Sequence, residues 1–423
     1  MKKEIKKLIF SMINLGCTKN LVDSQFLLGK ILSDAEDMLY STDPYDPDVE
    51  LVFLNTCGFI SSGREEALST VNKLLQKNKK VCITGCAVKY RQDLTDSADS
   101  QRKAIKPHIS ILTRHEIDQL FLTATPRALT NIDQGFEYLK IAEGCDNSCS
   151  FCIIPLIRGK QQSLPIEKVV SSAENLIQQG AKEIILIAQD STRYGTDLYG
   201  KPQLFELLEQ IEQIDVDFKY RVLYLYPDLL TQKQLEKLTT FSKFIPYFDI
   251  PLQHISSTLL KNMGRFYDGP AIYQFLDFIQ TSFPVHFIRT NFIIGFPGET
   301  DQDVQLLHDF IAKDYFDNIA LFEYHDEPLA ASSKLPNKID EKLIHTRFTA
   351  FRRQVNQLLL SREHLRKGEK ETGFIQEISP QTISVRPRLH CPEIDEIDDI
   401  SPAQILTIEG KEIKVGSKIT YLV

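Results

Sequence analysis

A chain of 423 residues is too long for one compact core, which predicts two or three domains. With 42% hydrophobic and 25% charged residues, it has the composition of an ordinary globular protein and is too apolar for a disordered one. The formal net charge of -8 and a pI near 5.7 argue against a surface built mainly to neutralise nucleic-acid phosphates, and they leave basic protein partners open.

The first residues, MKKEIKKLIFSMINLGC, imitate an exported lipoprotein signal, because lysines precede an apolar run that ends at a cysteine. The run is short, and Asn14 and Leu15 stand where a cleavage site needs an apolar and then a small residue. No later stretch supplies the roughly 20 apolar residues of a membrane span. We therefore expect a cytoplasmic protein without membrane attachment, in which clustered cysteines stay reduced and indicate metal or redox chemistry.

The N-terminal part alternates strands and helices. The short apolar runs KLIFSMIN, VELVFLN and KVCITG each end in a glycine-containing turn, which predicts a parallel α/β sheet. Cys17, Cys57 and Cys86 stand at or just beyond the ends of these runs. Because the carboxyl ends of parallel strands share one edge, where ligands bind, we expect the three cysteines to meet there.

A second strand–helix series follows the segment TATPRALTNIDQ, which has no clear periodicity and is typical of a linker. Its predicted strands are YLKIAE, EIILIA, RVLYLY, YFDIPL, VHFIRTNFII and NIALFEY. A well-marked helix after the first strand has Pro165 near its start and Gly180 just past its end. Six such units predict a (β/α)6 partial barrel, because a full barrel needs about 250 residues.

The C-terminal part changes character twice. The charged segment over residues 339–370 predicts a helix with a solvated face, which we prefer to an RNA-binding interpretation of its basic residues. From about Glu371, the runs GFIQEIS, TISVRPR, ILTIEG and KITYLV predict a small β-barrel. The acidic stretch HCPEIDEIDD within it is either a plain solvated loop or a surface that repels RNA and attracts a basic protein.

Three thiols lie close together in EGCDNSCSFC, at Cys145, Cys149 and Cys152, which places them on one loop after the first barrel strand. Thiolates at this density select zinc or an iron–sulfur cluster. Zinc normally takes four protein ligands from paired C-x2-C elements, and no second pair follows. A 4Fe-4S cluster held by three cysteines leaves one iron open to bind a small molecule.

At these residues the sequence resembles the radical S-adenosylmethionine (SAM) superfamily, whose signature is C-x3-C-x2-C with an aromatic residue, here Phe151, before the last cysteine. The resemblance implies a 4Fe-4S cluster whose open iron binds SAM, and a single electron that cleaves SAM to a 5′-deoxyadenosyl radical. It also implies a need for a reducing electron donor. The predicted partial barrel agrees with it independently.

The stretches LGCTKNLVDSQ, NTCGFI and TGC, with Cys17, Cys57 and Cys86, resemble the N-terminal domain of the methylthiotransferases within that superfamily. The resemblance implies a second, auxiliary 4Fe-4S cluster on this trio, against the alternative of three small buried hydrophobic residues. It divides the chain into a methylthiotransferase domain (1–125), a radical SAM domain (130–365) and a TRAM-like substrate-recognition domain (366–423). Cys82, inside an apolar run, and the isolated Cys391 are not assigned to a cluster.

Two branches of the methylthiotransferases are close. KIAEGCDNSCSFCIIPLIRGK, IAQDSTRYGTDLYG, DIPLQHIS and CPEID resemble the RimO branch, which modifies the β-carbon of an aspartate in the twelfth small-subunit ribosomal protein. The alternative branch modifies isopentenyladenosine beside the anticodon of tRNA. The acidic terminal part favours a basic ribosomal protein, free or within the ribosome, over tRNA.

Other residues are weaker candidates. Gln189, at the end of the second barrel strand, and Phe151 are predicted to contact SAM. GFPGET, with Gly295 and Gly298, indicates either close approach to the nucleoside or an ordinary strand-to-helix turn.

Three charged or titratable side chains also stand out, and none is predicted to be catalytic. Arg158 either pairs with a carboxylate of cofactor or substrate or lies on the surface. Asp249 and His254 are interpreted as structural or pocket residues, because a radical that abstracts hydrogen needs no strong base.

Overall fold

The computed structural model describes residues 7–90, 108–123, 125–410 and 413–423. The chain forms two compact units. The first unit comprises Met1–Thr130, Glu143–Asp146 and Ile153–Gln162, and the second comprises Asn131–Ala142, Asn147–Cys152 and Ser163–Val423. The short strands β7 (Ala142–Glu143) and β8 (Gln162–Ser163) stand where the chain passes between the units. In the part of the chain that is described, no helix is long and apolar enough to cross a membrane.

The first unit contains a five-stranded sheet whose paired strands are all parallel, in the order β2-β1-β3-β4-β5. Its strands are β1 (Leu8–Asn14), β2 (Met38–Tyr40), β3 (Leu51–Thr56), β4 (Lys80–Gly85) and β5 (Ile109–Ile111). Its helices are α1 (Thr18–Asp34), α2 (Ser61–Gln76), α4 (Arg114–Leu122) and α5 (Ile154–Arg158). The three strands predicted from apolar runs are therefore confirmed as β1, β3 and β4.

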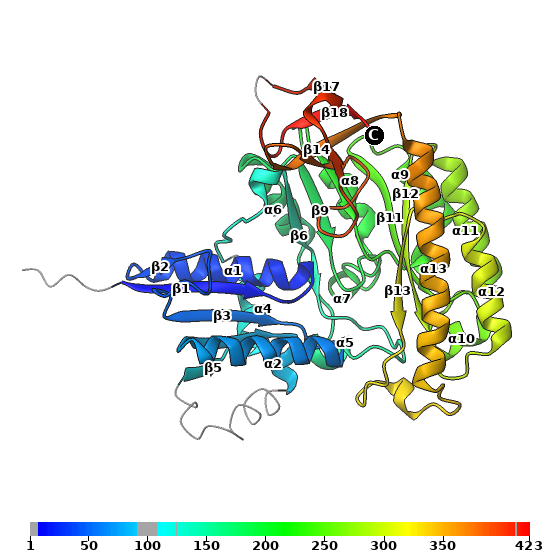
Figure 1. The fold of residues 1–423 in the computed structure, drawn as a ribbon, viewed down its shortest axis with the longest axis horizontal. Coiled ribbons are helices and arrows are strands. Elements are labelled where there is room, and N and C mark those ends of the chain that lie inside the picture. The colour runs from blue at the N-terminus through cyan, green and yellow to red at the C-terminus, as the bar shows by residue number, and fades with distance from the viewer. Residues whose placement is uncertain (1–6, 91–107, 124, 411–412) are drawn as a thin grey trace, which may run out of the picture. The chain divides into compact units, whose positions relative to one another are not determined.

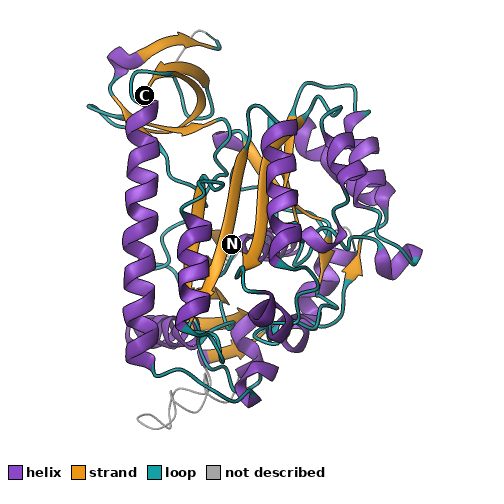
Figure 2. Cartoon of the chain, turned by 90° about the vertical axis from the view of Figure 1, so that its right-hand side faces the viewer, coloured by secondary structure: helices purple, strands orange, loops and turns teal. Residues whose placement is uncertain are grey.

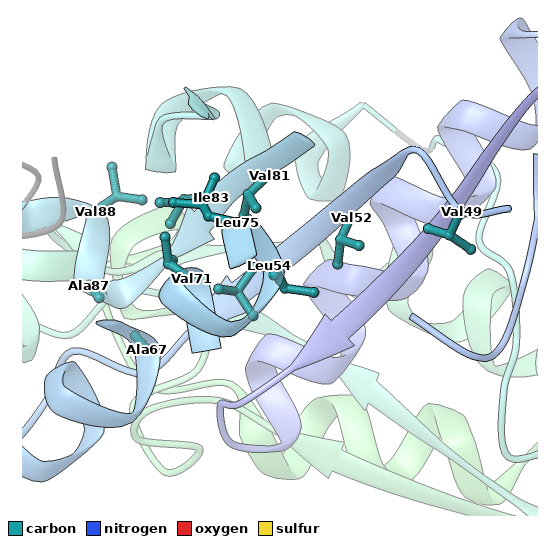
Figure 3. Packing of buried hydrophobic residues seen from close by; sticks show 11 residues of the cluster. Val49, Val52, Leu54, Ala67, Val71, Leu75, Val81, Ile83, Ala87 and Val88 are labelled. Carbon is teal, nitrogen blue, oxygen red and sulfur yellow. The ribbon is translucent and has the colours of Figure 1, made fainter. Parts of the chain in front are cut away.

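Both faces of this sheet are buried, because α1 and α2 cover opposite sides (Figure 1). Along β3, Val52 and Leu54 face the core that α2 completes, which Figure 3 shows, while Phe53 faces the core that includes Leu28 of α1. Cys82 lies in this second core and is 6% exposed, which confirms that it is a core residue. Strands buried on both sides are continuously apolar, which is why the sequence revealed them.

The second unit contains a six-stranded parallel sheet in the order β13-β12-β11-β10-β9-β6. Its strands are β6 (Phe136–Lys140), β9 (Glu183–Ile187), β10 (Lys219–Val222), β11 (Phe244–Gln253), β12 (Phe287–Ile294) and β13 (Asn318–Glu323). The helices are α6 (Ile166–Gln178), α7 (Thr196–Tyr199), α8 (Leu204–Glu212), α9 (Gln232–Leu238), α10 (Ser257–Asn262), α11 (Gly269–Ser282) and α12 (Asp301–Ile311). Six parallel strands with intervening helices confirm the predicted (β/α)6 partial barrel.

Helix α13 (Glu341–Arg366) begins at the capping side chain of Asp340 and packs along the end of this sheet. Ile344, Phe351 and Val355 are buried on its inner face, while Arg352 and Arg353 are exposed. This division confirms a helix with one packed and one solvated face.

The terminal strands form an antiparallel five-stranded sheet, β16-β15-β14-β18-β17, which curls beyond the end of α13 (Figure 2). The strands are β14 (Lys370–Ile378), β15 (Ile383–Pro387), β16 (Asp398–Ile400), β17 (Ile405–Ile408) and β18 (Lys418–Leu422). The short acidic β16 was not predicted, because its residues DDI show no apolar alternation.

The acidic stretch after β15 is not a plain solvated loop. Cys391 is fully buried, and the carbonyl of Pro392 accepts a hydrogen bond from the Tyr138 hydroxyl at 2.9 Å. Asp395 accepts a hydrogen bond from the Asn318 amide at 2.6 Å. Burial raises the pKa of the Cys391 thiol well above its usual value. The first half of the stretch therefore docks on the six-stranded sheet, and the charge of Asp395 is used inside the protein.

A buried ion triad holds the same junction. Glu183 accepts from Nε of Arg221 at 2.6 Å and pairs with Nη2 of Arg386 at 2.9 Å, and all three side chains are at most 1% exposed. Arg221 also donates to the carbonyls of Leu389 and Arg388, at 2.7 and 3.1 Å. The terminal sheet is thus joined to the barrel by charged groups that have no access to water.

Candidate functional site

Three cysteines meet at one edge of the first unit's sheet. Cys57 directly follows Thr56 and Cys86 directly follows Gly85, and these two preceding residues are register partners on the neighbouring strands β3 and β4. Cys17 follows β1, which pairs with the other side of β3, and it is the residue directly before α1. The predicted meeting of the trio is therefore what the fold produces, while its role as a set of metal ligands stays a prediction.

Asn20, on the first turn of α1, lies between two members of the trio, Cys17 and Cys86. Its Oδ1 atom lies 3.5 Å from Sγ of Cys17 and 3.8 Å from Sγ of Cys86. Its amide nitrogen donates to Oδ1 of Asn55 at 2.7 Å, and the Asn55 amide donates back to the Asn20 carbonyl at 2.7 Å. This reciprocal pair fixes the start of α1 against β3. The sequence interpretation missed Asn20, because its partner is 35 residues away.

A glycine allows the strand ends to approach closely. A Cβ on Gly58 would lie 2.6 Å from the backbone of Cys86 and Ala87. Any larger residue would push the segment after β3 away from the segment after β4. The spacing between Cys57 and Cys86 therefore depends on this glycine.

The thiols of the trio have different electrostatic surroundings. Burial raises the pKa of the Cys57 thiol, and the nearby Cys86 and Cys17 raise it further. At Cys17, desolvation by surrounding atoms is outweighed by Lys19, Arg158 and backbone N–H groups, so the pKa is lowered. Because the Cys17 side chain is exposed, we assign this lowering to the cations and the helix N-terminus.

Arg158, at the end of α5, is not a surface residue, so that sequence interpretation was wrong, while its pairing with a carboxylate of cofactor or substrate stays a prediction. Its side chain is 1% exposed. Nη1 donates to Oε1 of Glu143 at 2.8 Å and Nη2 donates to Oδ1 of Asn20 at 2.5 Å. Nε points at Sγ of Cys86, 3.3 Å away.

The second trio lies on the loop after β6, and its members belong to different units. Cys145 is in the first unit, where its N–H donates to the Gly159 carbonyl at 3.1 Å. Cys149 and Cys152 are in the second unit, where the Cys152 N–H donates to the Cys149 carbonyl at 3.1 Å. That the three hold one cluster stays a prediction from their spacing.

Around Cys149, the second unit assembles a group of aromatic rings and one buried cation. The guanidinium carbon of Arg265 lies 4.2 Å from the ring centroid of Tyr226 and 5.6 Å from that of Phe151. Sγ of Cys149 lies 3.9 Å from the Tyr226 hydroxyl. Arg265 is 5% exposed, and its Nε and Nη1 atoms have no hydrogen-bond partner among the residues described. This arrangement suits an anionic group of a ligand.

Sequence reasoning missed Arg265, although a glycine gave a signal. Gly264 has a φ of +73°, and a Cβ there would lie 2.7 Å from the Ser148 carbonyl oxygen. Ser150 also donates its N–H to the Met263 carbonyl at 3.0 Å. The segment that carries Arg265 is therefore pressed against the cysteine loop.

The remaining candidates have the following places. Gln189 follows β9, as predicted, and its contact with SAM stays a prediction. Phe151 packs beside the apolar cluster of Leu259, Met263, Ile293 and Phe296. Gly295 has a φ of +85°, and a Cβ there would lie 2.5 Å from Ile344 of α13. Both the backbone conformation and the packing of α13 therefore require glycine at this position.

Asp249 and His254 form hydrogen bonds with different partners. The Asp249 carboxylate accepts from Arg289 at 2.8 Å and from the Tyr224 N–H at 3.0 Å. Nδ1 of His254 accepts from the Ser256 N–H at 3.0 Å. Both side chains therefore have structural partners.

Within the described residues, no three or more His, Cys, Asp or Glu side chains are grouped as a ready site for one metal ion. The first trio nevertheless offers the donor set of an iron–sulfur cluster: three soft sulfur atoms at one edge, beside Gly63, where a Cβ would lie 3.1 Å from Sγ of Cys57. The residues present therefore fit such a group.

The comparisons with known proteins define first the class. The family model "Radical SAM superfamily" matches residues 139–311, and the model "Uncharacterized protein family UPF0004" matches residues 10–105. In fold, the chain is similar to the radical S-adenosylmethionine methyltransferase TsrM from Kitasatospora setae, with a TM-score of 0.55 and 13% identity over 77% of each chain. The protein is thus a radical SAM enzyme, a class that uses SAM and a 4Fe-4S cluster.

Curated relatives define the family. The chain is 35% identical to the ribosomal protein uS12 methylthiotransferase RimO of Pseudothermotoga lettingae over 94% of both chains. It is 34% identical to the protein of the same name from Parasynechococcus marenigrum, over 96% of this chain and 89% of that one. The chain belongs to the RimO family of methylthiotransferases, which confirms the predicted resemblance.

Proposed function

We propose that this enzyme attaches a methylthio group to the β-carbon of an aspartate in ribosomal protein uS12. The observation that carries the proposal is the match to relatives named for this activity, over nearly the whole of both chains. Two trios of cysteines, one in each part that the family models match, support it.

Each trio would hold one 4Fe-4S cluster: Cys145, Cys149 and Cys152 the radical SAM cluster, and Cys17, Cys57 and Cys86 an auxiliary one. When bound, the first supplies the electron that cleaves SAM to a 5′-deoxyadenosyl radical, and the second holds the sulfur that SAM methylates. With three cysteine ligands, each cluster would keep one iron available to bind a small molecule directly.

The residues around Cys149 would bind and orient SAM. Arg265 has two buried N–H groups that could donate to a carboxylate. The negative charge of that carboxylate would offset the buried positive charge of Arg265. Phe151 offers an aromatic face for the adenine, and Gln189 offers an amide at the end of β9. Cys149 itself is 8% exposed, so little water would reach a bound cluster at this cysteine.

The substrate would be recognised by the C-terminal part of the chain, for which we propose a TRAM-like domain over residues 366–423 beside the radical SAM domain (130–365) and the methylthiotransferase domain (1–125). The net charge of -8 favours a basic ribosomal protein over tRNA. Cys391, Pro392 and Asp395 are turned inward, whereas Glu393, Glu396 and Asp399 are exposed and would attract such a partner.

The test is the mass of the uS12 peptide that carries the modified aspartate, measured in a strain that lacks this gene. We expect the methylthio increment to be lost, to return with the wild-type gene and with Cys82→Ala, and to stay absent with Cys86→Ala. Cys82 lies four residues earlier, on β4 and in the core, whereas Cys86 follows the end of that strand, so Cys82→Ala controls for cysteine loss. If the strain instead loses a methylthio adenosine from tRNA, the protein substrate is wrong.

A further inference from the structure

The guanidinium of Arg158 donates to Glu143, Asn20 and Cys86, and Nη1 also reaches Oδ2 of Asp23 at 3.5 Å. Nη1 and Nη2 donate to Glu143 and Asn20, at 2.8 and 2.5 Å. Because the guanidinium is a rigid planar fork, these two bonds fix the direction of the third N–H. That third group, Nε–H, is directed at Sγ of Cys86, 3.3 Å away.

The charge of Arg158 is offset by carboxylates and not by water. Its side chain and that of Asp23 are each 1% exposed, and that of Glu143 is 4% exposed. Both carboxylates are shared with Arg114, at 2.7 Å from Asp23 and 3.0 Å from Glu143. Buried charges persist when they are paired in this way. The network thus keeps a cation beside Cys86 without using the sulfur as its counter-ion.

The sulfur is the partner whose chemistry this contact changes. A neutral thiol is a weak acceptor, whereas a metal-bound thiolate is anionic and accepts a charge-assisted hydrogen bond. Hydrogen bonds to ligand sulfurs and nearby charge are among the factors that set the reduction potential of an iron–sulfur cluster. A cation that donates to a ligand sulfur stabilises the added electron and so raises the potential.

We propose that Arg158 is a positioning residue that orients Cys86 and raises the reduction potential of the auxiliary cluster. This inference rests on the proposed assignment of Cys17, Cys57 and Cys86 to that cluster. Arg158 follows Cys152 by only six residues, so the segment that carries the radical SAM cysteines also supplies the cation for the other cluster. Arg158 acts through its contact with Cys86, which is why we call it a positioning residue.

The experiment isolates the auxiliary cluster in the full-length chain. Replacing Cys145, Cys149 and Cys152 by serine removes the other cluster, and the anaerobically prepared protein is assayed for iron and for its midpoint potential by electron paramagnetic resonance during stepwise reduction with dithionite. Three changes are made in this background: Arg158→Lys, Glu143→Gln, and the double change of Arg158→Gln with Glu143→Gln.

The double variant is compared with Glu143→Gln alone, because both lack the same carboxylate. In the double variant, the loss of Arg158 therefore leaves no unpaired carboxylate at position 143. We expect its potential to be lower than that of the single variant. Arg158→Lys keeps the charge but lacks the rigid fork. Its potential should therefore fall below that of the parent, but by less than the double variant falls below Glu143→Gln. We also expect chelators to remove the cluster roughly 10–100-fold more readily from the double variant.

Arg114→Gln is the matched control, because Arg114 pairs with the same carboxylates but its recorded bonds go to carboxylates and not to Cys86. Its potential should stay closer to that of the parent than the potential of Arg158→Lys does, because the N–H of Arg158 that points at Cys86 is kept. Equal potentials in the double variant and Glu143→Gln, with the cluster intact in both, would overturn the role of Arg158 alone. Should the double variant fail to fold, a potential in Arg158→Lys equal to that of the parent would likewise overturn the role of Arg158. A background protein without iron would instead overturn the auxiliary site itself.

Discussion

At the residue scale, His254 shows how burial fixes a protonation state. Its imidazole is fully buried, and Nδ1 accepts a backbone hydrogen bond, so the proton of the neutral ring is on Nε2, 3.8 Å from Glu299. Burial lowers the pKa of His254 from 6.5 to about 4, against the opposing effect of Asp303. The neutral ring is therefore part of the folded state, which agrees with a structural role and not with that of a general acid.

This lowered pKa predicts a pH-dependent stability. Below pH 6.5 the His254 ring is protonated in the unfolded chain, whereas in the folded chain it stays neutral down to about pH 4. The contribution of His254 is complete above pH 6.5 and is lost as the pH falls through that window, by about 2 kcal/mol between pH 7 and pH 5. His254→Asn keeps an acceptor for the Ser256 N–H without a titrating group.

Urea denaturation of the wild type and of His254→Asn at pH 7 and pH 5 measures this contribution. The free energy of unfolding should fall less for the variant than for the wild type, by the same amount of about 2 kcal/mol. Parallel pH dependence of the two proteins would show that the ring is protonated equally in both states.

At the residue scale the sequence also has a clear limit. Six cysteines could be chosen from spacing and strand ends alone, because a loop with three thiols and three thiols at strand ends are local patterns. Asn20, Arg158 and Arg265 could not, because what matters about them is a contact made after folding. Arg158, for example, lies 72 residues from Cys86 and 138 from Asn20.

At the scale of elements, the long strands were predictable and the short ones were not. Strands such as β3 and β9 are buried along nearly their whole length, so their apolar runs are continuous. Strands β2, β5 and β16 have three residues each and are only partly buried, so neither run nor alternation marks them. Their pairing is set by their neighbours in the sheet.

The close approach of the segments after β3 and β4 gives a prediction for Gly58. In Gly58→Ala, the added methyl group would meet the backbone of Cys86 and Ala87 at 2.6 Å, and the backbone cannot rotate away. We expect a loss of roughly 1–3 kcal/mol in stability. We also expect the iron content of the anaerobically reconstituted protein to fall by about half, because one of two clusters is lost.

The control for this change is Gly180→Ala. Gly180 has a φ of +109° with open space around the position of a Cβ, so alanine there costs stability through backbone strain alone. Its iron content should match that of the wild type. Full iron content in Gly58→Ala would mean that the spacing of Cys57 and Cys86 is not critical for the cluster.

At the scale of the whole molecule, the terminal sheet is an integral part of the second unit. Its link to the barrel consists of carbonyl oxygens, a buried cysteine and the ion triad of Glu183, Arg221 and Arg386. In the sequence, this segment is recognisable only as an acidic loop, and both interpretations of its charge placed it on the surface. The segment is held in place by hydrogen bonds from Tyr138, Arg221 and Asn318, which belong to three strands of the barrel.

The docking predicts that the terminal sheet loosens when Arg221 is replaced. In Arg221→Met, the carbonyls of Leu389 and Arg388 lose their donor, and Glu183 keeps only Arg386. Removing one partner from a buried ion network should cost about 3 kcal/mol. Hydrogen exchange should therefore accelerate over residues 370–422, while β9 to β12 stay protected.

Lys219→Met is the matched control for that experiment. Lys219 lies on the same strand, but its Nζ donates to the exposed carbonyl of Ser242, so its loss should leave exchange in the terminal sheet unchanged. If Arg221→Met and Lys219→Met exchange alike, the terminal sheet is held by its apolar contacts and not by the buried charges. Faster exchange in Arg221→Met alone would show that the substrate-recognition domain we propose is rigidly attached to the barrel.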